Sequence, residues 1–163
     1  MKKQTDPRMH SAEHILNQTM IRLYDCGRCF SAHIERKKSK CDYRFDHELT
    51  QHEVDEIQAR VNRVIESDLP VSETFVLKDE AHRLHDTDKL PEGVDGSVRI
   101  IHMGTYDACS CIGDHVASTG EIGIFRITTT SYHEGVLRIR FKLSCNIQVN
   151  PEISQTCMRT VRF

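Results

Sequence analysis

The chain has 163 residues, of which 38% are hydrophobic and 28% charged, and its formal net charge is −2 at pH 7. This length fits one domain with a real core, and the charge excludes a uniformly basic nucleic-acid-binding surface. No apolar run approaches bilayer-spanning length and the opening residues MKKQTDPRMH contain no apolar signal region, so no membrane association is expected.

The first predicted element is a helix over about residues 7–25. Asp6 is a good N-cap and Pro7 fits the first helical turn, where its missing N–H has no intrahelical partner to lose. Apolar residues then recur at helical spacing, and Gly27 is a natural stop.

The rest of the chain alternates between strand and helix patterns. Two short strands at 29–35 and 41–46 are joined by a basic turn at 36–40, and a second helix starts at the capping box of Thr50 with Glu53 and ends near Asp68. The remaining predicted elements are strands at 71–77, 98–103, 122–128 and 136–143, a short helix at 79–85 and a loop at 86–97.

Helices and antiparallel strands in this order predict an α+β fold, a two-layer sandwich with helices on one face of an antiparallel sheet. We assign residues 1–143 to one domain. Residues 144–163 are assigned to a C-terminal extension packed on the same domain, with an extra strand pair as one reading.

Two histidines on the first helix are the first candidates for chemistry. His10 and His14 are four residues apart, so on a helix both imidazoles lie on one face and can reach a single ion. The alternative is that one histidine packs in the core and the other lies on the surface, with no metal bound. The sequence His10-Ser-Ala-Glu13-His14 also fits the inverted zinc-protease motif, in which the glutamate is a general base. Such proteases take their third ligand from a downstream glutamate.

A second pair, Cys111 and His115, encloses turn-forming residues that can fold the two ligands together. With the first pair it offers three nitrogens and one thiolate, a set suited to one Zn²⁺ ion. Cys29 and His33 have the same spacing, but in a strand four residues span roughly 13 Å, too far for one ion. The alternative for Cys111 is a buried, inert thiol.

The other cysteines give weaker signals. The seven are an odd number without secretory context, which predicts reduced thiols and a cytoplasmic location. Cys26 and Cys29 have redox or zinc-knuckle spacing without a second half, and they follow a helix rather than open one. Cys109 could replace Cys111 as a ligand, although packing is the simpler role.

The two ligand pairs, in this order and with this long interval, resemble the editing domain shared by alanyl- and threonyl-tRNA synthetases and by freestanding alanyl-tRNA editing proteins of the AlaX type. The segments Thr119–Ile127, Tyr43–His47 and Val61–Val71 resemble further parts of that family, so the likeness covers roughly residues 8–143. The resemblance implies the fold of that editing domain and zinc binding by its two motifs, here His10, His14, Cys111 and His115.

The sequence departs from the family pattern beside the ligands. Where the family has Cys-Gly-Gly-Thr-His, this chain has Cys111-Ile112-Gly113-Asp114-His115, so a glycine becomes bulky and a threonine becomes an acid. One arginine of the family's Gly-Val-Arg-Arg-Ile is replaced by Leu137. These changes point to a differently tuned pocket or to lost activity.

The resemblance implies hydrolysis, in trans, of the ester of a mischarged tRNA, with seryl- or glycyl-tRNA for alanine as the expected substrates. The alternative is a non-catalytic module that binds zinc and tRNA. Glu13 and Asp114 are the acids nearest to ligands in sequence, and neither is assigned as a catalytic base. We expect a monomer or homodimer that holds the tRNA acceptor end through basic residues. The alternative is that these residues are ordinary solvated strand ends. These residues are Arg36, Lys37, Lys38, Lys40, Arg138, Arg140 and Lys142.

Overall fold

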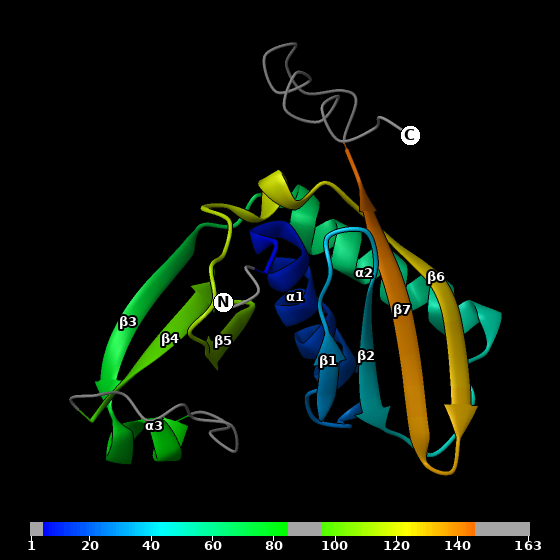
Figure 1. Cartoon of the computed structure of the whole chain (residues 1–163), viewed down its shortest axis with the longest axis horizontal. Coiled ribbons are helices and arrows are strands. Elements are labelled where there is room, and N and C mark those ends of the chain that lie inside the picture. The colour runs from blue at the N-terminus through cyan, green and yellow to red at the C-terminus, as the bar shows by residue number, and fades with distance from the viewer. Residues whose placement is uncertain (1–4, 85–95, 146–163) are drawn as a thin grey trace.

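A computed structural model describes residues 5–84 and 96–145. It is an α+β fold with two antiparallel sheets that splay apart on either side of helix α1 (Figure 1). The larger sheet has the strand order β1-β2-β7-β6 and the smaller one the order β3-β4-β5. The predicted fold class is confirmed, but the strands form two sheets where the sequence suggested one.

Helix α1 (Pro7–Tyr24) begins and ends close to where the sequence predicted. The carboxylate of Asp6 accepts hydrogen bonds from the backbone N–H groups of Arg8 and Met9, which caps the first turn. Asp25 ends the helix in the left-handed conformation, two residues before Gly27. Buried residues line more than one side of this helix because it packs against both the rest of the helical layer and the small sheet.

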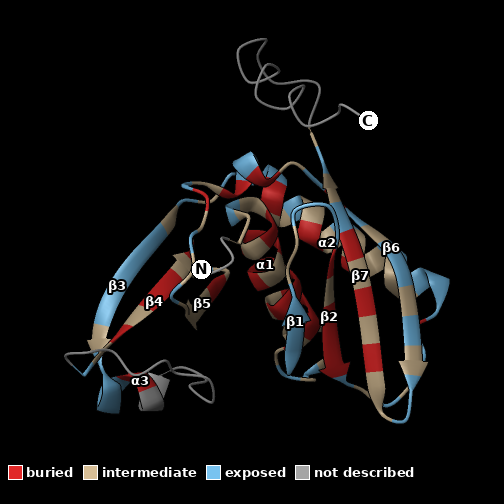
Figure 2. Ribbon diagram, in the orientation of Figure 1, coloured by how far each residue is buried: buried red, intermediate tan, exposed pale blue. Residues whose placement is uncertain are grey.

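The large sheet supplies most of the core. Its strands are β1 (Ser31–His33), β2 (Ser39–Arg44), β6 (Ile124–His133) and β7 (Val136–Ser144). Along β7, buried and more accessible residues alternate (Figure 2), so Leu137, Ile139 and Phe141 face the helices while the residues between them face outward. One face of this sheet is therefore core and the other is open to solvent.

The small sheet is built from β3 (Val71–Leu77), β4 (Ser97–Met103) and β5 (Asp107–Ser110). Helix α3 (Lys78–Leu84) covers one face, where Ala81 packs with Val98 and Ile100 in a small second core. The opposite face carries Ile101 and Met103, which join the main core with α1. This arrangement sets the N-terminal half of α1 beside β5 and the turn that follows it.

Helix α2 (Gln51–Glu66) starts at the predicted capping box of Thr50 and Glu53. Its side chains also form hydrogen bonds with the backbone of the edge strand of the large sheet. The amide of Asn62 donates to the carbonyl of Phe125 and accepts from its N–H, both at 2.8 Å, and Gln58 accepts from the N–H of Ile127 at 2.8 Å. These side chains replace part of the partner strand that edge strand β6 lacks.

Several predicted boundaries were wrong. Strand β1 is only three residues long and excludes Cys29, and the strand expected at 122–128 begins at Ile124, after the short 3₁₀ helix η1 (Thr119–Ile122). Strand β5 was not predicted, because its four residues are too few to show an alternating pattern. Most of the predicted loop at 86–97 and the tail beyond Cys145 lie outside the described residues.

No helix in the described parts of the chain is long and apolar enough to cross a membrane. Among the described cysteines, Cys26, Cys29, Cys41, Cys109 and Cys111 are not in disulfides. Cys145 is in a disulfide, so the expectation of reduced thiols is wrong at that position.

The bridge from Asn62 to strand β6 predicts a stability loss on substitution. Replacing Asn62 with Leu leaves a strand N–H and a carbonyl without their partner, so the free energy of unfolding should fall by about 1–3 kcal/mol. Urea unfolding of Asn62→Leu measures this. Arg63→Ala, at the exposed neighbouring position, should stay within about 0.5 kcal/mol of the wild type. Equal stability of the two variants would contradict the role of Asn62.

Candidate metal centre

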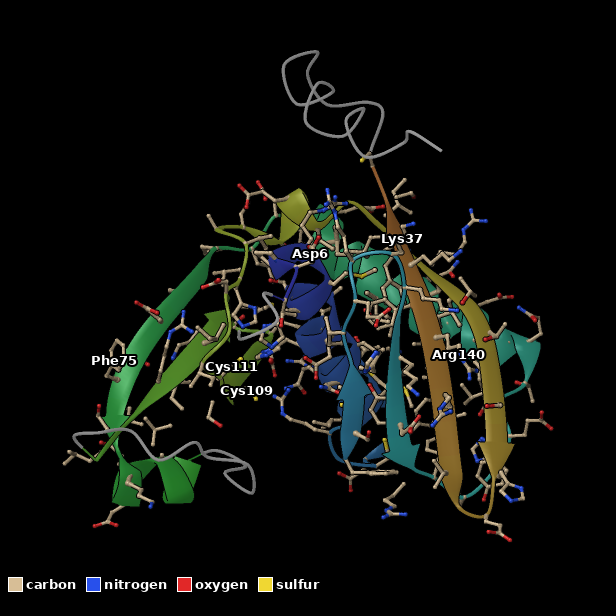
Figure 3. All side chains as sticks on the ribbon, viewed as in Figure 1. Asp6, Lys37, Phe75, Cys109, Cys111 and Arg140 are labelled. Atoms are coloured by element: carbon tan, nitrogen blue, oxygen red, sulfur yellow. The ribbon has the colours of Figure 1, made fainter. Side chains whose placement is uncertain are left out.

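Four side chains from two distant segments meet between α1 and the turn after β5. His10 and His14 come from α1, and Cys111 and His115 from the turn, which lies beside the helix (Figure 3). Their ligand atoms all lie within 4.8 Å of one another, so this group could hold a metal ion. The two pairs are about 100 residues apart in the sequence and were predicted to form one set of ligands. The packing of β5 on α1 brings them together.

The turn that carries Cys111 is held by the small sheet. The N–H of Cys111 bonds the carbonyl of Arg99 on β4 at 3.2 Å. In return, the guanidinium of Arg99 donates to the carbonyls of Gly113 at 2.8 Å and Cys111 at 3.3 Å. Glu73 on β3 pairs with the same guanidinium. Strands β3 and β4 therefore fix the backbone of the ligand turn.

Gly113 is required at its position because His10 lies against it. A Cβ added there would lie 2.3 Å from Cε1 of His10, closer than side-chain atoms approach in practice. The two residues that depart from the family pattern point elsewhere: the side chain of Ile112 is 67% exposed, and Asp114 is also exposed. The bulky and acidic replacements thus do not fill the space among the four ligands.

All three histidines turn their Nδ1 atoms away from the centre of the group. Nδ1 of His10 lies 3.3 Å from the carbonyl oxygen of Asp114, Nδ1 of His115 lies 3.1 Å from the hydroxyl of Ser11, and Nδ1 of His14 lies 3.5 Å from a carboxylate oxygen of Asp107. Nε2 of His10 and of His115 lie 3.2 and 3.5 Å from the Cys111 sulfur. Second partners of this kind fix the ring orientation of metal-binding histidines.

The electrostatics of the group favour a thiolate. Burial alone would raise the pKa of Cys111, but hydrogen bonds from His10, His115 and His14 outweigh it and lower that pKa to about 3. Burial acts to lower the pKa of His14, but its contacts with Asp107 and Cys111 raise the pKa to about 9. Burial lowers the pKa of His115. The group therefore presents a ready thiolate beside imidazoles.

The chemistry of this donor set fits zinc. One thiolate and three imidazole nitrogens, converging from different directions within a few ångströms, match the four-coordinate sites of Zn²⁺. Of these ligands, only His14 is fully buried, so the group sits at the surface rather than deep in the core.

Other predicted candidates lie outside the group. Cys29 precedes β1 and His33 is exposed on it, and neither joins the four ligands. Cys26 points to backbone carbonyls of Met20 and Gly27. Burial raises the pKa of Cys109 to about 12, which keeps a neutral thiol at that position.

Glu13 lies at the edge of the group. Its carboxylate is 3.7 Å from Nε2 of His10 and accepts hydrogen bonds from Asn17 and from the thiol of Cys29. Cys111 and His115 fill the positions that a zinc protease would give to a downstream glutamate, and the ligand group contains no acid. The inverted protease motif is therefore a weak guide to this site.

Sequence reasoning missed the residues that support the ligands. Ser11, Arg99 and Asp107 contact ligand side chains or the ligand turn, and Arg28 and Gln18 contact Asp107. Nothing in their spacing marks them, since each pairing spans a long interval of sequence or joins unrelated types. Only Ser11 had a signal, its place between the two histidines.

The basic residues predicted to contact tRNA gather on the large sheet, apart from the ligand group (Figure 3). Lys40 on β2 pairs with Arg140 on β7 across the sheet, and Lys142 pairs with Arg126 on β6. The remaining residues, Arg36, Lys37 and Lys38, are exposed between β1 and β2. Arg138 differs, because it makes two hydrogen bonds to the carboxylate of Asp42.

A family profile and individual relatives both link the chain to the aminoacyl-tRNA synthetases. The sequence profile described as threonyl and alanyl tRNA synthetase second additional domain matches residues 98–140. Alanine–tRNA ligases match over more of the chain. That of Halorubrum lacusprofundi is 35% identical over 106 residues, which cover 63% of this chain and 11% of the ligase.

Two further alanine–tRNA ligases align over most of the chain. That of Idiomarina loihiensis is 31% identical over 140 residues, covering 81% of this chain and 16% of the ligase, and that of Methanopyrus kandleri is 30% identical over 138 residues, covering 82% and 15%. The chain thus spans about a sixth or less of the relatives it matches. It belongs to the family of the threonyl and alanyl tRNA synthetase second additional domain.

Proposed function

We propose that this protein is a zinc-dependent aminoacyl-tRNA deacylase, which hydrolyses the ester of a mischarged tRNA in trans in the cytoplasm. Seryl- and glycyl-tRNA for alanine are the proposed substrates. The observation that carries the proposal is the meeting of His10, His14, Cys111 and His115, within 4.8 Å, in a chain related to alanine–tRNA ligases.

The chemistry of ester hydrolysis fits these residues. Bound zinc would polarise the ester carbonyl, lower the pKa of a water molecule or orient the substrate. Cys111 and the three histidines would hold the ion, while Arg99 keeps the turn of Cys111 in place. Of the two acids next to ligands, Glu13 is the one whose carboxylate faces the group, so it is placed to accept a proton.

The outer face of the large sheet supports contact with tRNA. Lys40 and Arg140 are like charges on directly paired positions, an arrangement that costs stability by itself. A phosphate between them would relieve the repulsion, and phosphate contacts supply most of the affinity of proteins for nucleic acids. We therefore assign Lys40 and Arg140 to the acceptor stem, together with Lys142 and the exposed basic residues before β2. Arg138 is a weaker candidate because Asp42 already pairs with it.

A specific feature favours a second candidate. Four protein ligands are the number found in structural zinc sites, whereas catalytic zinc usually keeps one position open. The alternative is accordingly a zinc- and tRNA-binding module of the same fold in which the metal serves only the structure.

The deacylase and the module differ in turnover. The purified protein should hydrolyse seryl- or glycyl-tRNA for alanine in a panel that includes alanyl-tRNA. Cys111→Ala should lower the rate at least about 100-fold, because the loss of the thiolate weakens the site. Release of the labelled amino acid and the zinc content of each preparation are the measurements. Cys109→Ala is the matched control and should keep the wild-type rate. Stoichiometric zinc with no turnover on any substrate would favour the module.

The shifted pKa values predict how many protons zinc displaces. At pH 7 Cys111 is already a thiolate and releases none, whereas His14, with its pKa raised to about 9, must lose its proton to become a ligand. Zinc binding to the metal-free protein should therefore release a proton from His14 and none from Cys111. Calorimetry in buffers of different ionisation enthalpy gives the number. Loss of the wild-type proton signal in His14→Ala supports the assignment, and an unchanged signal in that variant would contradict it.

The basic face predicts a change in the salt dependence of tRNA binding. Replacing both Lys40 and Arg140 with alanine should weaken binding and lower the slope of log affinity against log salt by about 1–2, because one or two phosphate contacts are lost. Anisotropy of labelled tRNA in a salt series measures the slope. Arg60→Ala on α2, which removes a charge paired with Glu56, is the control. An unchanged slope in the double variant would remove this face from the interface.

A further inference from the structure

Asp107 is a buried acid next to the candidate metal centre for which the proposed reaction has no role. It is the first residue of β5 and is 3% exposed. Its Oδ1 accepts hydrogen bonds from the amide of Gln18, at 2.9 Å, and from the guanidinium of Arg28. A buried carboxylate is costly unless it is paired, so these contacts explain how it can remain charged.

The second oxygen of Asp107 is in a different situation. In the described parts of the chain, three buried side-chain atoms lack a hydrogen-bond partner: Oδ2 of Asp107, Nδ1 of His14 and one guanidinium nitrogen of Arg28. The first two face each other at 3.5 Å. Buried polar atoms are rarely left unmatched, and here two unmatched atoms of complementary type are neighbours.

Oδ2 of Asp107 can accept a hydrogen bond from His14 only when the ring carries a proton on Nδ1. An ion bound at Nε2 leaves the remaining proton of a neutral imidazole on Nδ1, and that N–H then faces Oδ2. The contact with Asp107 therefore favours the neutral tautomer in which Nε2 is free to bind a metal ion.

We propose that Asp107 is a positioning residue for the metal ligand His14, and that Gln18 and Arg28 fix its carboxylate for this task. This inference rests on the proposed zinc site, and it does not depend on which ester, if any, is hydrolysed. The carboxylate would orient the His14 ring and make its Nε2 a stronger ligand for a bound metal ion.

The three histidine ligands are not equivalent in this respect. His10 has a backbone carbonyl as its outer partner and His115 has the hydroxyl of Ser11, both neutral. Among the three described histidine ligands, His14 is the one whose Nδ1 faces a carboxylate, and it is also the most buried. The charged contact is therefore made by the ligand whose ring is least accessible to water as an alternative partner.

Arg28 extends the same network to the large sheet. It lies in the segment between α1 and β1 and pairs with Asp107 of the small sheet. One line of contacts thus runs from the segment that leads into the large sheet, through Asp107, to a ligand on α1. The position of His14 is set by both halves of the fold.

The experiment measures metal affinity without tRNA. Asp107→Asn keeps the size of the side chain and removes its charge, so zinc affinity in competition with a chromogenic chelator should fall roughly 10- to 100-fold. The visible absorption of the Co²⁺-loaded protein should change as well, because the orientation of one ligand is altered. Asp114→Asn is the matched control, since Asp114 contacts His10 only through its backbone carbonyl, and it should match the wild type.

A second variant tests the proposal if Asp107→Asn does not fold. Gln18→Ala removes one neutral donor to Asp107 and leaves the charge in place, and it should weaken zinc binding roughly 2- to 10-fold. Wild-type affinity and an unchanged Co²⁺ spectrum in a folded Asp107→Asn protein would overturn the proposal, as would wild-type affinity in Gln18→Ala. A wild-type protein that takes up no zinc would instead overturn the metal site on which the proposed function rests.

Discussion

Buried charge between α1 and β5 is the constraint on which the site depends. The carboxylate of Asp107 is buried and the thiolate of Cys111 is half-buried, and the guanidinium of Arg28 and the imidazoles balance their charges. The carboxylate of Asp107 would be strongly destabilising without partners, because an unpaired buried charge costs several kcal/mol. The two sheets therefore have to bring their partners to α1 together, and the approach of β5 to the helix is part of the same balance.

The sequence predicted the elements that carry strong local signals. The cap of α1 at Asp6, the capping box of α2 and strand β3 lie where their residue patterns place them. The four ligand residues were predicted as one group because helical spacing on α1 and a turn after residue 110 each bring two of them together. The convergence of both pairs is a property of tertiary packing, and it was inferred from the family resemblance.

What the sequence could not predict is long-range pairing. Strand β5 has four residues, too few for a pattern, although it carries Asp107. The division of the strands into two sheets depends on which edges meet, and the periodicity of single strands contains no information on this. Arg99 and Arg28 look like ordinary surface cations in sequence, and only the fold reveals that one holds the ligand turn and the other a buried acid.

The close contact between Gly113 and His10 divides the ligand turn into two kinds of position. Gly113 faces inward and tolerates no side chain, whereas Ile112 and Asp114 face solvent, where size and charge are unrestricted by the metal ligands. Substitutions at the outward positions therefore change the exposed surface beside the ligand group and leave its interior as it is. The size and charge of residues 112 and 114 can vary while the four residues of the ligand group keep their positions, whereas a side chain at 113 would displace His10.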